Sequence, residues 1–339
     1  MRRVIVITGG TAGVGRAIAR RFACERDAVA VLARGQEGLA ATVRDIKRLG
    51  GHGLGIAGDV ADAGQVEAAA EQVERELGPI DVWINNAMTT AVGPVEAITP
   101  EEFQRITDVC YHGCVWGTRA ALRHMRPRNR GTILQVGSAL AYRSIPLQAA
   151  YCGAKHAIRG FTDSLRSELL HERVNIALCM VQLPAINTPQ FDWCVNKMDH
   201  ALGPVPPIFQ PEIVADAIHR LSRYPRREVL LGGSAIKAIL GNKLVPGLAD
   251  RYLASRGYTG QLRDAPNLHG PANLFAPVPG DHGAHGRFDH QARSRDVVAR
   301  IATVLGGAGV QAVVAAAVAT AGAALVAATS AWWTARRSS

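Results

Sequence analysis

The feature that most constrains the fold is the order of three patterns in the first 24 residues. The apolar run at residues 4–7 (VIVI) is typical of a buried strand, and it leads directly into the glycine-rich stretch at residues 8–15 (TGGTAGVG). A helical pattern then continues through Cys24. Glycines let a backbone approach a pyrophosphate, and the N–H groups at a helix N-terminus bind it. A lone glycine-rich loop is often only a tight turn, but its place between a first strand and a helix favours dinucleotide binding.

A serine, a tyrosine and a lysine near the middle of the chain form a second pattern with chemical meaning. Ser138 follows the apolar run 133–136, Tyr151 stands thirteen residues after Ser138, and Lys155 stands four residues after Tyr151. Residues four apart share a helix face, so we expect the Lys155 ammonium to lower the pKa of the phenol from its usual value of about 10. Ser138 is then placed to hydrogen-bond a substrate carbonyl oxygen. The Tyr-x-x-x-Lys spacing also arises by chance, so its weight comes from the glycine-rich turn upstream.

With its T-G-x-x-x-G-x-G spacing, the turn together with Ser138, Tyr151 and Lys155 resembles the short-chain dehydrogenase/reductase family. Further matches follow in order: residues 58–60 (GDV) after a third strand, residues 85–87 (NNA) closing a fourth, and residues 184–188 (PAINT) after a sixth. Met88 and Ala185 replace glycines that the family usually carries. The resemblance implies an α/β fold, a Rossmann-type doubly wound parallel sheet, over residues 1–235.

The resemblance also implies roles for single residues. Tyr151 is the implied acid or base, Lys155 tunes it and holds the nicotinamide ribose, and Ser138 orients the substrate oxygen; these three are the candidate catalytic residues. Asp59 is implied to meet the adenine ring edge, and Ile186 and Thr188 the nicotinamide and its carboxamide. The full set of candidate cofactor-binding residues is Thr8, Gly9, Gly13, Val14, Gly15, Arg34, Asp59, Val60, Asn86, Ala87, Tyr151, Lys155, Pro184, Ile186 and Thr188.

Arg34 favours NADP(H) as the cofactor. NAD-preferring relatives carry an acid after the second strand, here residues 28–33, to accept a hydrogen bond from the ribose 2′-hydroxyl. Arg34 stands there instead, and a guanidinium matches the geometry of a 2′-phosphate. Against this, Ala12 lacks the second basic residue of many NADP-preferring relatives, and Arg34 can also be read as a solvated loop residue. NAD(H) stays the alternative.

Cys110 is a departure from the family pattern. It aligns with an asparagine that helps to hold a water in a proton relay from the active-site lysine to solvent, and a thiol is a poor hydrogen-bonding substitute. We expect slower or differently relayed proton transfer rather than loss of chemistry. The alternative interpretation is that Cys110 fills a packing site in its helix.

The expected function is hydride transfer between the nicotinamide and a carbonyl or alcohol. Residues 190–209 hold aromatic and proline residues where the family places its substrate-binding loop, which predicts a lipophilic small-molecule substrate or, alternatively, aromatics that only pack the loop down. A dinucleotide-binding sensor or scaffold without turnover is the second class of function, which Cys110 makes conceivable. The intact set of Ser138, Tyr151 and Lys155 favours the enzyme. Relatives commonly assemble into homo-oligomers through the helices around Cys110 and Lys155.

Beyond the family core the composition changes twice. Residues 236–259 are predicted to be a helical extension, and residues 260–300 a linker rich in proline, glycine and histidine. Asp281, His282, His285, Asp289 and His290 raise the question of a metal site, but glycines within the motif and the lack of helical spacing favour a solvated linker without metal.

Residues 301–339 differ again, because no charged residue stands between Arg300 and Arg336. Residues 310–333 are long enough for a transmembrane helix, and they end in a Trp-Trp pair followed by two arginines, as expected at a membrane interface. The stretch is mostly alanine, so its valines and leucine give an insertion free energy of only about −2 to −4 kcal/mol. The alternative is a helix buried against another subunit. With a membrane span, the catalytic domain is expected in the cytoplasm.

Composition and charge bear on nucleic-acid binding and on the redox compartment of the protein. The net charge of +10 comes from 33 arginines and 5 lysines against 28 acids, spread over the chain, and no nucleic-acid-binding module is recognisable. The six cysteines lack the spacing of a disulfide framework, which fits a reducing compartment. Because the sequence begins in the first strand, no signal peptide is expected.

Overall fold

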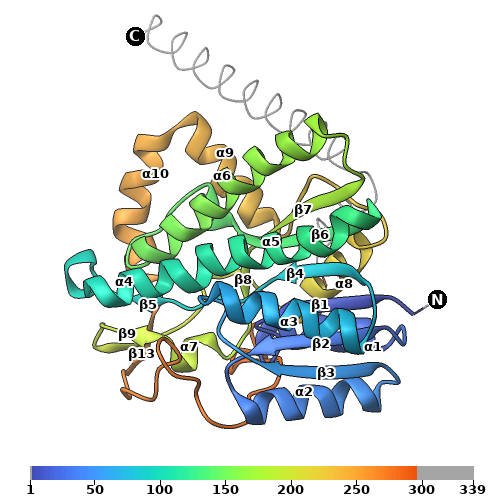
Figure 1. Cartoon of the computed structure of the whole chain (residues 1–339). Helices are drawn as coiled ribbons and strands as arrows, with labels where there is room; N and C mark the ends of the chain where they lie inside the picture. The colour runs from blue at the N-terminus through green and yellow to red at the C-terminus, as the bar shows by residue number, and fades with distance from the viewer. Residues whose placement is uncertain (1, 296–339) are drawn as a thin grey trace, which may run out of the picture.

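The computed structural model describes residues 2–295, and its centre is a parallel sheet of seven strands in the order β12-β7-β6-β4-β1-β2-β3 (Figure 1). Every neighbouring pair runs parallel. The strands are β1 (Val4–Thr8), β2 (Ala28–Ala33), β3 (His52–Ala57), β4 (Ile80–Asn85), β6 (Gly131–Ser138), β7 (Ile176–Leu183) and β12 (Glu228–Leu230). The predicted doubly wound α/β architecture is therefore confirmed.

Helices cover both faces of the sheet, as the apolar strands require. They are α1 (Gly13–Ala23), α2 (Gln36–Arg48), α3 (Ala63–Glu76), α4 (Pro100–Thr107), α5 (Gly113–Met125), α6 (Ala149–His171) and α8 (Pro211–Leu221). Successive side chains of β1 point to opposite faces: Ile5 and Ile7 pack with α1, α2 and α8, whereas Val4 and Val6 pack with α3, α5 and α6.

The strand order reverses between β1 and β4. From β1 the chain winds outward through β2 and β3, and it then returns to pair β4 with the other side of β1. The carboxyl ends of these two strands consequently face a crevice that no crossover helix fills, which is where open parallel sheets bind ligands.

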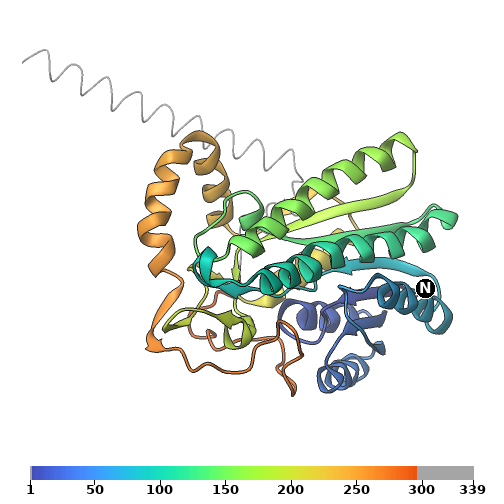
Figure 2. The ribbon, with the colours of Figure 1, turned by 60° about the vertical axis from the view of Figure 1, so that its left-hand side comes forward.

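Smaller elements build a second layer over that crevice. Three two-stranded pairs join β5 (Ala91–Val92) to β9 (Val195–Asn196), β8 (Ala185–Ile186) to β11 (Ile208–Phe209), and β10 (His200–Leu202) to β13 (Leu262–Pro266). The short helix α7 (Gln190–Trp193) lies among them, and the helices α9 (Gly233–Leu244) and α10 (Pro246–Tyr252) stand out from the core as an arm (Figure 2).

Residues 260–295, expected to be a linker, lie against the core in the structure. After β13 the chain passes back beneath the molecule toward its N-terminal half (Figure 2). Three apolar side chains of this stretch are buried, Leu274 (1% exposed), Ala284 (3%) and Phe288 (4%). The buried amide of Asn187 holds its end, because it donates to Asp289 Oδ1 (2.8 Å) and accepts from the backbone N–H of Phe288 (3.1 Å).

The expected transmembrane helix, residues 310–333, lies outside the described residues. Within residues 2–295, no helix has the length and apolar character needed to cross a bilayer.

Candidate active site

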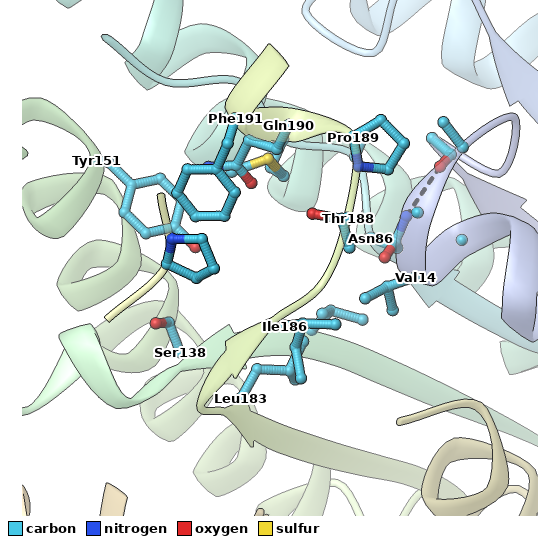
Figure 3. Close-up of a pocket in the computed structure, with 18 of the residues that line it drawn as sticks. Val14, Asn86, Ser138, Tyr151, Leu183, Ile186, Thr188, Pro189, Gln190 and Phe191 are labelled. Carbon is cyan, nitrogen blue, oxygen red and sulfur yellow. Dashed lines mark hydrogen bonds between the residues drawn. The ribbon is translucent and has the colours of Figure 1, made fainter. Parts of the chain in front are cut away.

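One cavity of about 490 Å³ opens at the carboxyl ends of the central strands. It is lined by the three candidate catalytic residues and by every candidate cofactor-binding residue except Thr8. Figure 3 shows Ser138 and Tyr151 on one side of this hollow, Val14 and Asn86 on the other, and Ile186 and Thr188 between them. Residues from five separate stretches of sequence thus meet at one place.

The glycine-rich turn forms a cradle that side chains would fill. Gly9 and Gly13 have φ angles of +66° and +55°, which favour glycine. A Cβ on Gly15 would lie 2.2 Å from the carbonyl oxygen of Gly9, and a Cβ on Gly9 would lie 2.7 Å from Cα of Ala87. Because α1 begins at Gly13, its N-terminal N–H groups and partial positive charge face the cavity, so these residues fit the pyrophosphate of a dinucleotide.

Thr8 and Asn86 hold this turn in place. The Asn86 side chain donates to the carbonyl oxygens of Thr8 (3.0 Å) and Gly9 (2.9 Å), while the Thr8 hydroxyl accepts from the backbone N–H groups of Asn86 (3.0 Å) and Ala87 (3.1 Å). Thr8 is 1% exposed and does not line the cavity. Its contribution is therefore to join β1 to β4 rather than to touch a ligand.

Ser138, Tyr151 and Lys155 come together from β6 and α6. Ser138 ends β6, and its hydroxyl accepts from the backbone N–H of Leu140 (3.1 Å) and lies on the same side of the cavity as the Tyr151 phenol (Figure 3). Lys155 follows one helical turn after Tyr151, and its ammonium lies 5.5 Å from the centroid of the tyrosine ring. The same ammonium donates to the carbonyl oxygen of Val136 at 2.8 Å.

The protonation of Tyr151 differs from the expectation based on helix spacing. Burial raises the pKa of the phenol, the thiol side chain of Cys110 raises it further, and the Ser138 hydroxyl only partly opposes them. Burial also lowers the pKa of Lys155. The expected lowering of the tyrosine pKa is thus not found, because burial, which disfavours the charged phenolate, has the largest effect on Tyr151. The phenol is therefore protonated at neutral pH.

Cys110 lies in a π-helical turn, Asp108–His112, between α4 and α5. Its thiol donates to the carbonyl oxygen of Thr89 (3.2 Å) and accepts from the backbone N–H of the same residue (3.4 Å). The residue is 1% exposed, and burial raises the pKa of the thiol. Both hydrogen bonds fix the loop after β4 to the helix that faces Tyr151. These contacts support the interpretation that Cys110 fills a packing site.

Arg34 and Asp59 line the cavity with partners that the sequence did not reveal. The Arg34 guanidinium donates to the backbone carbonyls of Asn273, Leu274 (3.2 Å) and Phe275 (3.0 Å). Asp59 pairs with Arg105, which also donates to the Leu274 carbonyl (3.0 Å). These partners lie far from Arg34 in sequence and use main-chain oxygens, so neither spacing nor residue type could indicate them.

The predicted substrate loop contributes only part of its aromatic residues to the cavity. Phe191 and Trp193 of α7 line it, as do Pro204, Val205 and Pro206. Met198 packs in a small apolar cluster, and Phe209 is buried in the main core. Some aromatic and proline residues of the loop thus line the cavity, and others pack the loop against the protein.

The acidic and histidine residues after Gly280 make other contacts. Asp281 pairs with Arg16 (3.0 Å), the His282 ring packs edge-on against Trp193, and His285 contacts Glu212 (2.8 Å). Within residues 2–295, no three His, Cys, Asp or Glu side chains are grouped so that they could hold a metal ion.

Comparison with known proteins adds independent information. The sequence profile of a family described as short chain dehydrogenase matches residues 3–195. The uncharacterized oxidoreductase YxnA of Bacillus subtilis is 31% identical over 267 residues, which are 78% of this chain and 75% of that protein. The 3beta-hydroxysteroid dehydrogenase of Mediterraneibacter gnavus is 32% identical over 164 residues, 48% of this chain and 59% of that protein. The crystal structure of a short-chain type dehydrogenase/reductase from Mycobacterium marinum is similar with a TM-score of 0.60 and 27% identity, over 69% of this chain and 95% of the other.

The raised pKa of Tyr151 predicts how stability depends on pH. In the unfolded chain the phenol ionises near pH 10, but in the folded protein it stays protonated to higher pH, so its contribution to stability is present below about pH 10 and is lost above it. Urea unfolding measured from pH 7 to 11 should show wild type losing stability relative to Tyr151→Phe only above about pH 10. Tyr224→Phe, at a position 65% exposed, should follow the wild-type curve. Parallel wild-type and Tyr151→Phe curves would contradict the prediction.

Proposed function

The chain belongs to the short-chain dehydrogenase family, and we propose that it is an NADP(H)-dependent oxidoreductase that interconverts a lipophilic ketone or aldehyde and its alcohol. The observation that carries the proposal is the meeting of Ser138, Tyr151 and Lys155 with the glycine-rich cradle in one cavity. A bound nicotinamide supplies or accepts the hydride. The protein then has to bind the substrate oxygen and move one proton.

We assign these two tasks to different hydroxyls. The Tyr151 phenol, kept protonated by burial, donates its proton to the substrate oxygen when a carbonyl is reduced. The Ser138 hydroxyl donates a hydrogen bond to the same oxygen. The buried Lys155 ammonium stabilises the phenolate that remains, and it would hold the nicotinamide ribose.

A sensor or scaffold without turnover is the alternative, and the active-site geometry argues against it. A protein that only binds a dinucleotide needs the cradle but not a buried phenol beside a buried ammonium, because both groups cost hydration free energy. Cys110 leaves the side chains of Ser138, Tyr151 and Lys155 with their mutual contacts. We therefore retain Cys110 as a modifier of the proton relay.

The substrate end of the cavity supports a lipophilic substrate. Besides Ser138 and Tyr151, the lining includes the apolar residues Leu140, Ile145, Phe191, Trp193 and Val205, together with the polar Gln148, Arg256 and Gln261. Apolar walls around a few hydroxyl groups select an apolar molecule by burial and orient it by hydrogen bonds. One relative is named a 3beta-hydroxysteroid dehydrogenase, and a steroid is a lipophilic substrate of this general kind.

The remaining proposals concern location and assembly. Residues 310–333 are proposed to anchor a cytoplasmic catalytic domain to a membrane, on the strength of their length, apolar composition and flanking aromatic and basic residues. A homo-oligomer formed through α5 and α6 stays a prediction, which sedimentation of the purified chain would test.

Tyr151→Phe should lower turnover by about 10² to 10⁴-fold while nucleotide affinity stays nearly unchanged, because only the transferable proton is lost. The assay is NADPH oxidation with a panel of lipophilic ketones, beside a fluorescence titration of NADPH. Tyr224→Phe is the matched control. If Tyr151→Phe retained most of the activity, Tyr151 would be excluded as the proton donor.

Arg34→Asp should weaken NADPH binding by at least tenfold and leave NADH binding equal or stronger. The new carboxylate repels a 2′-phosphate but can accept a hydrogen bond from a 2′-hydroxyl. Titration of both nucleotides against both proteins measures this, and Arg44→Asp, on the outer side of α2, controls for the change in net charge. An unchanged NADPH affinity would exclude Arg34 from the site.

The tail proposal predicts that the full chain stays in the membrane fraction after an alkaline carbonate wash, whereas a chain ending near residue 300 is soluble. The physical reason is that the wash releases surface-bound protein but not a spanning helix. Release of the full chain by the wash would favour the alternative, a helix that packs against another subunit.

A further inference from the structure

Residues 273–283, here called the cover segment, lie along the mouth of the proposed nucleotide site. At one end Asn273, Leu274 and Phe275 place their carbonyl oxygens on the Arg34 guanidinium. At the other end the carbonyl of Gly283 accepts from the backbone N–H of Gly13 at 3.0 Å. The cover segment therefore bonds with two groups proposed above to bind phosphates, one for the 2′-phosphate and one for the pyrophosphate.

Between these ends the contacts continue along the same edge. Pro277 lies against Gly35, so that a Cβ on Gly35 would be 3.4 Å from Cβ of Pro277. Asp281 pairs with the buried Arg16 at 3.0 Å. Pro277, Val278 and Gly280 also line the cavity itself. The cover segment thus closes the edge of the cavity from Arg34 to the glycine-rich turn.

The cover segment is firmly seated at its ends and loosely held between them. Leu274 is 1% exposed in a cluster with Ile106 and Cys110, and Ala284, the residue after the segment, is 3% exposed in the main core. Phe275 is 60% exposed, and the Asp281 side chain is 43% exposed. A stretch with little buried apolar surface between two anchors has a low free energy of local opening.

The contacts at Leu274 show what would open it. Two guanidinium groups, those of Arg34 and Arg105, donate to one neutral carbonyl oxygen at 3.2 and 3.0 Å. Burial and the neighbouring Arg105 lower the pKa of Arg34, and Asp59, which pairs with Arg105, only partly opposes them, so Arg34 itself has backbone carbonyls and no carboxylate as its partners among the described residues. Charge-assisted hydrogen bonds to an anion are roughly twice as strong as those to a neutral acceptor. A phosphate would therefore displace the carbonyls, whereas a hydroxyl would not.

We propose that the cover segment must lift for the dinucleotide to enter, and that Arg34 is its latch, exchanged between the carbonyls of residues 273–275 and the 2′-phosphate of NADP(H). This inference rests on the proposed function. It makes the segment a determinant of cofactor specificity: NADP(H) supplies the anion that releases Arg34, and NAD(H) lacks it. Bound nucleotide would then leave only as fast as the segment reopens.

A disulfide between the cover segment and the rim tests the lifting. Disulfides join Cβ atoms about 3.5 to 4.5 Å apart, and Gly35, with φ of −85°, accepts a side chain. The protein is the full chain carrying Gly35→Cys and Pro277→Cys, and each single variant is a control. Cys24, an exposed native cysteine, is changed to serine in all of them.

Stopped-flow fluorescence of NADPH association is the readout, and it needs no turnover. The oxidised double variant should associate with NADPH at least tenfold more slowly than the same protein after reduction, and NADPH loaded before oxidation should be retained. Equal association rates before and after reduction would show that the cover segment does not have to lift for NADPH to enter. If no form of the protein binds either nucleotide, both the proposed function and the proposed role of the cover segment are wrong.

The latch has its own test. Arg34→Ala should speed NADH association severalfold, because the cover segment is released, while it weakens NADPH affinity. Leu274→Ala removes the buried anchor and should speed association of both nucleotides, and Leu268→Ala, at a position 86% exposed, is the matched control. An Arg34→Ala protein that binds NADH at the wild-type rate would exclude Arg34 as the latch.

Discussion

The hydrogen bonds between Thr8 and Asn86 join the carboxyl ends of β1 and β4, and the rest of the site depends on this junction. Parallel strands diverge where the winding direction reverses, and the crevice there would otherwise have no fixed width. The Asn86 side chain ties the carbonyls of Thr8 and Gly9 to β4, and the absence of a side chain on Gly9 lets the turn approach Ala87. The position of the α1 N-terminus, and hence of the proposed pyrophosphate site, follows from that contact.

Burial governs the chemistry on the other side of the cavity. Tyr151 and Lys155 are one helical turn apart on α6, yet burial raises the pKa of the phenol and lowers the pKa of the ammonium, so loss of water opposes an ion pair between them. Proximity on a helix face was visible in the sequence, but the hydration of the two groups depends on β6 and the π-helical turn packed over them. The pKa values of Tyr151 and Lys155 thus depend on the fold as a whole.

Sequence patterns predicted strands and turns, which depend on neighbouring residues, and they missed contacts between residues that are far apart in the chain. The limits of β2 follow from its apolar run, and the cradle follows from glycine spacing. Arg34 lines the cavity, but its partners come from residues 273–275 through main-chain oxygens, which any residue type supplies. For the same reason a stretch rich in glycine and proline was expected to be a linker, although Leu274, Ala284 and Phe288 bury it against the core.

The position of the cover segment in the chain has a consequence for biosynthesis. The seven strands of the sheet and all helices that flank it are complete at residue 230, whereas residues 273–283 leave the ribosome later. Domains fold as units during synthesis, beginning from the N-terminus. The nucleotide groove therefore forms as an open site in the nascent protein and is closed by a segment that is made after the sheet, so a cofactor molecule captured during translation would be enclosed once that later segment has been synthesised.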